Sequence, residues 1–242
     1  FASSAGVKPR NEDFCAAMLP SALQEGMGMI AAVADGVSRG GLGQEAAQTT
    51  VLSLLSDYFG TAETWDVTVA LDRIISSQNA WLCGMNRRRQ PLMGMTTLTA
   101  LVLRGQSYAL AHVGDTRAYL LRDGQAVQMT QDHVVNHPDF RHQLVRALGL
   151  EEQLVVDYAQ GEVQAGDVFV LLSDGVHGVL PHPRVQALVG GDNAQTASDA
   201  LLEAALKAGS QDNLSALVVR VLGLSDACLQ DEKRMAQRLP VP

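Results

Sequence analysis

Cysteine is scarce in this chain of 242 residues, with only Cys15, Cys83 and Cys228. The three are scattered and form no CxxC pair. A disulfide framework or a zinc knuckle is therefore not expected. We expect a reducing, cytoplasmic compartment. No apolar run reaches the roughly 18–20 residues that a membrane-spanning helix needs. The chain also begins without a basic segment leading into an apolar stretch, so no signal peptide is expected.

Positive charge is also in short supply. Lys and Arg total 18 against 26 Asp and Glu, which gives a formal net charge of −8. This balance argues against electrostatic binding to nucleic acid or to anionic membranes, but it allows an acidic pocket that gathers cations.

The composition is that of a globular protein, with 47% hydrophobic and 18% charged residues. The length suits one large domain. We expect a single domain over residues 1–224 and a C-terminal helix or linker over 225–242.

The apolar pattern predicts both helices and antiparallel strands. Three- and four-residue spacing predicts helices over 43–59, 66–85 and 196–208. Apolar runs between turn signals predict strands over 28–34, 95–103, 107–113, 116–121, 125–129, 167–173 and 214–222, those from 95 to 129 as one antiparallel meander. Residues 131–143 are polar and predict a loop with a short helix. Blocks of helices and strands favour an α+β fold with two sheets packed face to face.

Acidic residues stand where apolar runs end, each beside a residue suited to a turn. Asp35, Asp115, Asp174 and Asp212 share this setting, and Glu12-Asp13 precedes a further short apolar stretch. Each Asp alone is most simply a turn residue. Together, carboxylates gathered at strand ends would repel one another unless cations neutralised them, and oxygen ligands suit Mg²⁺ or Mn²⁺.

A histidine-based zinc site is the weaker alternative. His133, His137 and His142 would share a face if their segment were helical, but no HExxH motif accompanies them. A polar surface loop explains them better.

Taken in order, these acidic turns and their neighbours resemble the motifs of the type 2C (PPM) metal-dependent Ser/Thr protein phosphatases. The resemblance runs from about residue 3 to 222. The motifs are Gly6, Asn11-Glu12-Asp13, Ala34-Asp35-Gly36, Gly94 with Thr96-Thr97, His112 to Arg117, Thr130 to His133, Arg146 to Gly149, Ser173-Asp174-Gly175 and Asp212-Asn213. The opening (6–13), the turn at 35–38 and the Leu-Pro-Val-Pro exit (239–242) also resemble the phosphatase half of bacterial phosphatase–kinase fusions.

The resemblance implies a four-layer αββα sandwich of two antiparallel sheets flanked by helix pairs, and two metal ions. Asp35 would bridge both ions. Glu12 and the carbonyl of Gly36 would hold one ion, and Asp174 and Asp212 the other.

Supporting roles follow from the same resemblance. Asp13 would orient metal-bound water without itself binding the ions. Asp115, with Asp174, would serve a looser third metal that bacterial relatives have. Thr97 and Asn213 would support the site.

The implied activity is hydrolysis of phosphoserine and phosphothreonine in proteins. Two cations would share a bridging hydroxide that attacks phosphorus in line, so no nucleophilic cysteine or serine is needed. A phosphorylated protein is the implied substrate, a Ser/Thr kinase in the same chain or pathway is an implied partner, and a monomer is expected. Two alternatives stay open: a regulatory or binding module that controls a kinase with little or no turnover, and a hydrolase of small phosphate esters.

The sequence departs from the family pattern where phosphate and substrate would bind. Lys8 stands where relatives have the phosphate-binding Arg, and Arg10 is its rival for that role. The flap between the Asp-His and Arg-Ala-Leu-Gly motifs is reduced to residues 134–145, which puts substrate range and the role of Asp115 in question. Val37 replaces a His proposed as general acid in some relatives, so metal-bound water or His137 would protonate the leaving group.

Overall fold

The computed structural model describes residues 1–37, 42–88, 94–137, 143–191, 193–224, 226–228 and 231. Every residue proposed above for the site lies in these ranges. His142, residues 38 and 39 of the Asp-Gly-Val-Ser turn region, and most of the expected C-terminal helix or linker lie outside the described residues.

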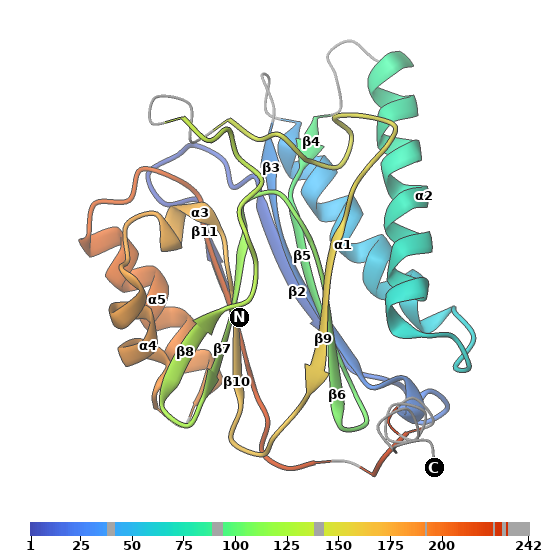
Figure 1. Ribbon diagram of the computed structural model, residues 1–242. Helices are drawn as coiled ribbons and strands as arrows, with labels where there is room; N and C mark the ends of the chain where they lie inside the picture. The colour runs from blue at the N-terminus through green and yellow to red at the C-terminus, as the bar shows by residue number, and fades with distance from the viewer. Residues whose placement is uncertain are drawn as a thin grey trace.

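Two antiparallel β-sheets form the centre of the molecule (Figure 1). The first sheet has the strand order β1 (Ala2–Ser4), β11 (Leu214–Arg220), β10 (Val168–Leu172), β7 (Arg117–Arg122) and β8 (Gln125–Gln128). The second has the order β2 (Asp13–Met18), β3 (Met29–Val37), β5 (Leu98–Arg104), β6 (Ser107–Val113) and β9 (Asp157–Glu162), with β4 (Met95–Thr96) paired to the end of β3.

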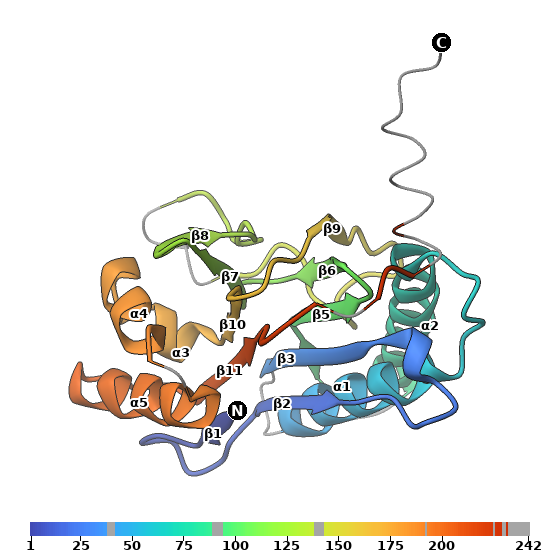
Figure 2. The same ribbon diagram turned by 90° about the horizontal axis from the view of Figure 1, so that it is seen from below.

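Helices cover the outer face of each sheet, as the view from below shows (Figure 2). Helices α1 (Gly43–Phe59) and α2 (Val67–Arg88) pack on the second sheet, after the short 3-10 helix η1 (Glu25–Met27). Helices α4 (His182–Val189) and α5 (Ala194–Lys207) pack on the first, preceded by the single turn α3 (Asp174–His177). The predicted four-layer α+β sandwich is confirmed. None of the described helices is long and apolar enough to cross a bilayer.

Strand β3 shows why its sequence is apolar on both sides. Ala32 and Ala34 pack toward α1 and α2, while Ala31 and Val33 belong to the core between the sheets. A strand with both faces covered carries a continuous apolar run rather than an alternating one. The same period of two makes Asp35 point into the space between the sheets, on the side of Val33.

Most predicted elements are confirmed, but three expectations were wrong. The strands from 95 to 129 do not form one meander, because the chain leaves the second sheet after β6 and enters the first at β7. Strand β3 does not stop before Asp35 but continues to Val37. Within the described part of 131–143 there is no helix; instead Val134 forms an isolated antiparallel bridge with Leu144.

Candidate functional site

Two aspartates face each other on neighbouring strands of the second sheet. Asp13, the first residue of β2, is directly opposite Asp35 of β3 in the antiparallel register. Asp13 is only 3% exposed. Like charges placed directly across two strands destabilise a sheet. A sequence that places two carboxylates here requires something at this spot to offset their repulsion.

Two more aspartates come to the same place from the first sheet. Asp174 follows β10 and Asp212 lies just before its neighbour β11, so adjacent strands deliver both. The negative charges of Asp174 and Asp212 act on both Asp13 and Asp35. Four of the predicted carboxylates therefore gather between the sheets at one end of the sandwich, the upper end in Figure 1.

Burial and mutual repulsion disfavour ionisation of this group. Burial, followed by the charges of Asp13 and Asp174, raises the pKa of Asp35 well above its usual range. Burial raises the pKa of Asp13 to about 7, against the opposing effect of the Ser173 and Ser215 hydroxyls. The pKa of Asp174 is also raised, chiefly by burial and by Asp212, although a hydrogen bond with Asp35 lowers it.

Asp115 joins the cluster from the segment that crosses between the sheets. Burial and the charge of Asp174 raise the pKa of Asp115 to about 7. His177 of α3 donates from Nε2 to the carbonyl of Asp115 at 2.8 Å. The Oδ1 atoms of Asp115 and Asp174 are buried, and none of the described residues donates a hydrogen bond to them. Buried carboxylate oxygens without partners are costly and fit ligands for a cation.

The backbone around Asp35 is held on both sides. Its N–H donates to the Thr97 hydroxyl at 2.8 Å, and its carbonyl accepts from the Thr97 N–H at 2.9 Å. The next residue, Gly36, donates its N–H to the carbonyl of Glu12. A Cβ on Gly36 would lie 2.1 Å from the carbonyl oxygen of Gly43, so only glycine fits where β3 passes the start of α1. Thr97 thus lies where a supporting residue would be expected.

Asn213 fastens the N-terminal loop to the first sheet. Its Oδ1 accepts from the Glu12 N–H at 2.9 Å, and its Nδ2 donates to the carbonyls of Ala5 and Arg10 at 3.0 and 2.8 Å. Gly6, at φ +61°, packs so closely on the carbonyl of Asp212 that a Cβ would lie 2.4 Å from it. These contacts bring the half-buried Glu12 beside the aspartates.

The two predicted phosphate-binding cations differ in their surroundings. Lys8 donates from Nζ to Oδ1 of Asp212. Burial would lower the pKa of Lys8, but this hydrogen bond and the charges of Asp212, Asp35 and Asp174 raise it. Arg10 is exposed, and its carbonyl is what contacts Asn213. Lys8 therefore lies at the carboxylate cluster itself.

The donor set fits hard divalent cations. It consists of carboxylate and carbonyl oxygens, which suit Mg²⁺ and Mn²⁺. Within the described ranges, no three His, Cys, Asp or Glu side chains already converge in a metal-holding arrangement. Two of these carboxylates already have a partner within the cluster: Asp212 accepts from Lys8, and Asp174 forms a hydrogen bond with Asp35. These partners offset the same repulsion that bound cations would offset.

Sequence reasoning missed His177 and the setting of His133. His177 is an isolated histidine after the Ser-Asp-Gly turn, and only its proximity in the fold shows that it contacts Asp115. His133 was expected on a polar surface loop, but it is 6% exposed. Val37 ends β3 and is exposed, and His137 is exposed beside the residues that are not described. The proposed acid role of His137 stays a prediction.

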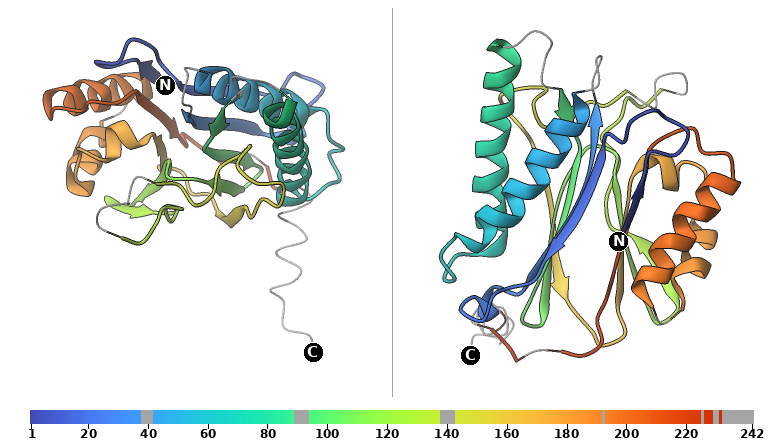
Figure 3. Two further views of the ribbon diagram at one scale, coloured as in Figure 1. Left: turned by 90° about the horizontal axis from the view of Figure 1, so that it is seen from above. Right: turned by 180° about the vertical axis from the view of Figure 1, so that it is seen from behind.

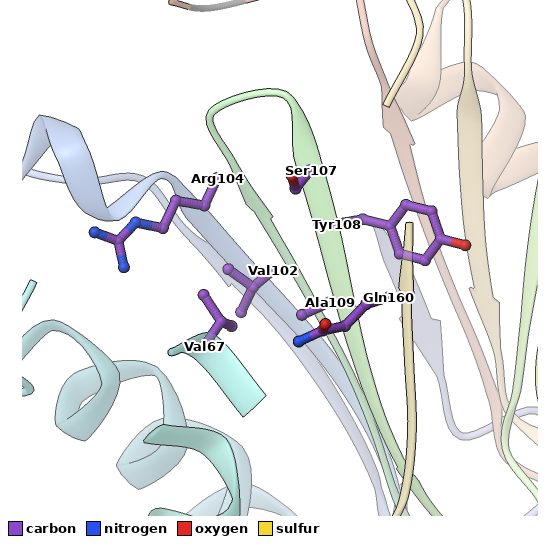
Figure 4. Close-up of a pocket in the computed structure, with 7 residues that line it drawn as sticks. All are labelled: Val67, Val102, Arg104, Ser107, Tyr108, Ala109 and Gln160. Atoms are coloured by element: carbon purple, nitrogen blue, oxygen red, sulfur yellow. The ribbon is translucent and has the colours of Figure 1, made fainter. Parts of the chain in front are cut away.

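A small cavity at the opposite end of the second sheet does not compete with this site. It is lined by residues of α2, β5, β6 and β9, as Figure 4 shows. Its volume is about 10 Å³, room for one water. The one cation that lines it, Arg104, donates from Nε to the carbonyl of Gly26 and from Nη2 to that of Glu63. Arg104 holds two loops together rather than offering a binding group.

The sequence profile of the family described as protein phosphatase 2C matches residues 3–219. The chain belongs to the protein phosphatase 2C family. The match covers both sheets and every aspartate of the cluster.

Individual phosphatases are similar over most of this domain. The chain is 29% identical over 208 residues to the serine/threonine protein phosphatase PstP of Mycobacterium tuberculosis, covering 79% of this chain and 40% of PstP. It is 29% identical over 214 residues to the serine/threonine phosphatase stp of Listeria monocytogenes, covering 78% of this chain and 83% of stp. The chain thus spans less than half the length of PstP.

A solved structure has the same fold. It is the catalytic domain of PstP in complex with two manganese ions, with a TM-score of 0.80 and 26% identity, covering 92% of this chain and 96% of that domain. The predicted sandwich is thus shared with a phosphatase domain that binds two metal ions.

Proposed function

We propose that this protein hydrolyses phosphoserine and phosphothreonine in proteins at a binuclear Mg²⁺ or Mn²⁺ centre. The observation that carries the proposal is the register of Asp13 opposite Asp35, joined by Asp174 and Asp212 from the other sheet. The family match and the two manganese ions of the PstP catalytic domain support it.

The residues divide the work as follows. Asp35 would bind both ions. Glu12 and the Gly36 carbonyl would also bind one ion, and Asp174 and Asp212 would bind the other. When bound, such ions activate water at neutral pH and neutralise charge on the phosphoryl oxygens. Burial raises the pKa of Asp35, so loss of its proton and binding of a metal ion would be coupled.

The side chains around the ions would handle protons and phosphate. Asp13, buried with a pKa of about 7, is able to hold or release a proton at neutral pH between the sheets. Lys8 has a flexible stem, so its ammonium can move from Asp212 to a phosphoryl oxygen. Asp115, with Asp174, would serve a third ion.

The chemistry of the substrate defines the partners. A phosphoester on serine or threonine is the product of a protein kinase, so a Ser/Thr kinase must act before this enzyme. Cytoplasmic location and a monomeric state belong to the same proposal.

The test is release of phosphate from phosphoserine and phosphothreonine peptides with Mn²⁺, compared with nucleotides and with excess chelator. We expect peptide turnover that the chelator and the Asp35→Asn variant each reduce by about 1,000-fold, since bound metals supply several kcal/mol to the transition state. Chelator-resistant turnover would contradict the metal mechanism. Faster turnover of nucleotides would favour a small-ester hydrolase, and a folded, metal-binding protein without turnover would favour a regulatory module.

A further inference from the structure

Gly114, which precedes Asp115, lies in a conformation and a space that only glycine fits. Its φ is +108°, and a Cβ there would lie 2.5 Å from Cγ2 of Thr97. The Gly114–Asp115 turn carries the chain from β6 to β7 and thus from one sheet to the other. The direction of the Asp115 carboxylate depends on how this turn is held.

His133 holds both polar groups of Gly114. The backbone N–H of His133 donates to the Gly114 carbonyl at 2.7 Å, and its ring Nδ1 accepts from the Gly114 N–H at 3.1 Å. The side chain of His133 is 6% exposed, and its ring lies 4.8 Å from that of His112. One residue, 19 positions later in the chain, thus fixes the turn.

The contacts of the ring specify one tautomer. Because Nδ1 accepts from a backbone N–H, the proton lies on Nε2, which donates to Oδ2 of Asp157 at 3.0 Å. Arg146 Nη1 lies 3.1 Å from the same Nε2, which cannot accept from it while it carries the proton, and donates instead to the other oxygen of Asp157 at 2.9 Å. Although burial opposes it, His133 and Arg146 hold the pKa of Asp157 below its usual value. Arg146 and Asp157 together orient the imidazole.

From this geometry we propose that His133 is a positioning residue for Asp115, kept in the required tautomer by Asp157 and Arg146. It acts through the backbone of Gly114 and touches neither metal nor substrate. The inference rests on the proposed function, because it takes Asp115 as a ligand of the least tightly held cation. The contacts between Arg146, Asp157, His133 and Gly114 then connect the two residues that flank the 134–145 segment, His133 and Arg146, to the turn that carries Asp115.

The test is calorimetric titration with Mn²⁺ without substrate, on wild type, His133→Ala, His133→Asn and the matched control His182→Ala, an exposed histidine of α4. For His133→Ala we expect the weakest Mn²⁺ site to lose about tenfold in affinity, as for residues that orient metal ligands. His133→Asn keeps an acceptor for the Gly114 N–H, so about half or more of that loss should be restored. His182→Ala should titrate as wild type does.

A double-mutant cycle separates positioning from general damage. When Asp115→Ala is already present, adding His133→Ala should change Mn²⁺ affinity by no more than about twofold relative to Asp115→Ala alone. If His133→Ala does not fold, Asp157→Ala, which changes a half-exposed side chain, takes its place. This variant should also lose Mn²⁺ affinity at the weakest site, but by less than about tenfold. Unchanged affinity, or an equal loss in both backgrounds, would overturn the inference. The titration measures Mn²⁺ affinity and needs no turnover. An inactive wild type would therefore contradict the proposed function, while the effect of His133 on Mn²⁺ affinity could still be measured.

Discussion

Lys8 and Asp212, 204 positions apart in sequence, form a hydrogen-bonded ion pair at the edge of the carboxylate cluster. Asp212 is a proposed metal ligand and Lys8 a proposed phosphate-binding residue. The ammonium and a metal ion therefore need the same carboxylate. If Asp212 held a metal ion, Lys8 would have to leave this carboxylate and would then be available to bind phosphate.

Removing this cation should tighten metal binding. Lys8→Met keeps the aliphatic part of the side chain but removes the ammonium group that competes for Asp212. We expect Mn²⁺ to bind about three- to fivefold more tightly, which corresponds to the energy of a partly exposed ion pair. The Michaelis constant for a phosphopeptide should rise at the same time. Calorimetry and steady-state kinetics measure the two effects.

Arg10→Met is the matched control, because it removes one positive charge from the same loop at an exposed position. Its Mn²⁺ affinity should change less than that of Lys8→Met. Equal gains in both variants would show that net charge alone is responsible. A loss of Mn²⁺ affinity in Lys8→Met would contradict the competition.

The buried carboxyl groups make the metal-free protein less stable as the pH rises. The pKa values of Asp13 and Asp115 are about 7 in the folded protein, against about 3.9 in an unfolded chain. Between these values the folded state binds more protons, so the free energy of unfolding falls as pH increases. In chelator we expect the Tm to drop by about 5 °C or more from pH 5 to pH 8.

Two additions sharpen this measurement. Asp13→Asn should flatten the slope, since the amide does not titrate. Saturating Mn²⁺ should reverse the slope, because metal binding requires the deprotonated ligands. A metal-free Tm that rises steadily over the same range would show that the cluster is not protonated in the fold.

Strand β3 passes the start of α1 so closely at Gly36 and Gly43 that we expect no side chain to be tolerated at Gly36. Gly36→Ala would place Cβ 2.1 Å from the Gly43 carbonyl oxygen and 2.8 Å from that of Glu12. Both contacts are to backbone, so we expect a loss of about 3 kcal/mol in the free energy of unfolding, the upper range of overpacking. Urea unfolding measures it.

Gly84→Ala is the control for this glycine. It lies in α2 with open space around the added Cβ. Alanine in a helix interior should stabilise the protein by up to about 1 kcal/mol. If Gly36→Ala were as stable as Gly84→Ala, the close contact between Gly36 and Gly43 would be contradicted.

Asn213 should matter for the site more than for the fold. Asn213→Ala removes three hydrogen bonds that hold the loop carrying Glu12, at Ala5, Arg10 and Glu12 itself. We expect Mn²⁺ affinity to fall about tenfold or more, the usual effect of losing a group that orients ligands. Mn²⁺ titration of the variant measures it.

A second asparagine separates the two effects. Asn193 accepts from the Thr196 N–H at the start of α5, 19 positions from both Asp174 and Asp212 in sequence. Asn193→Ala should cost about 1 kcal/mol of stability, as a lost helix cap does, with metal affinity unchanged. Similar losses of metal affinity in both variants would mean that Asn213 acts only through stability.

Much of the fold could be predicted because its central strands, such as β5, β6 and β10, are buried on both faces. Segments such as 107–113 and 214–222 read as apolar runs, and the structure has β6 and β11 there. Strand β9 was missed because it is a polar, exposed edge strand with no apolar alternation. Helix α3 was missed because Asp-Gly reads as a turn, and a single helical turn has the same residues.

The pairing of segments was harder to predict than the segments themselves. Nothing local in Gly114-Asp115-Thr116 distinguishes a hairpin turn from a crossover between sheets, so a single meander was expected. The strand order places β6 in one sheet and β7 in the other, and Figure 3 shows the two sheets with their helices from above and from behind. The acidic residues could be found by their place after apolar runs. The partner His177 could not, because only the fold brings it near Asp115. Asn213 was named from the family resemblance, but its three contacts with the N-terminal loop are seen only in the fold.

The most direct test of the central claim is anomalous scattering from crystals of this protein grown with Mn²⁺. The account predicts two manganese ions between the sheets, both bound by Asp35, one also by Glu12 and the Gly36 carbonyl and the other by Asp174 and Asp212, with Lys8 released from Asp212. Manganese absent from this end of the sandwich, in a protein that still releases phosphate from phosphopeptides, would contradict it.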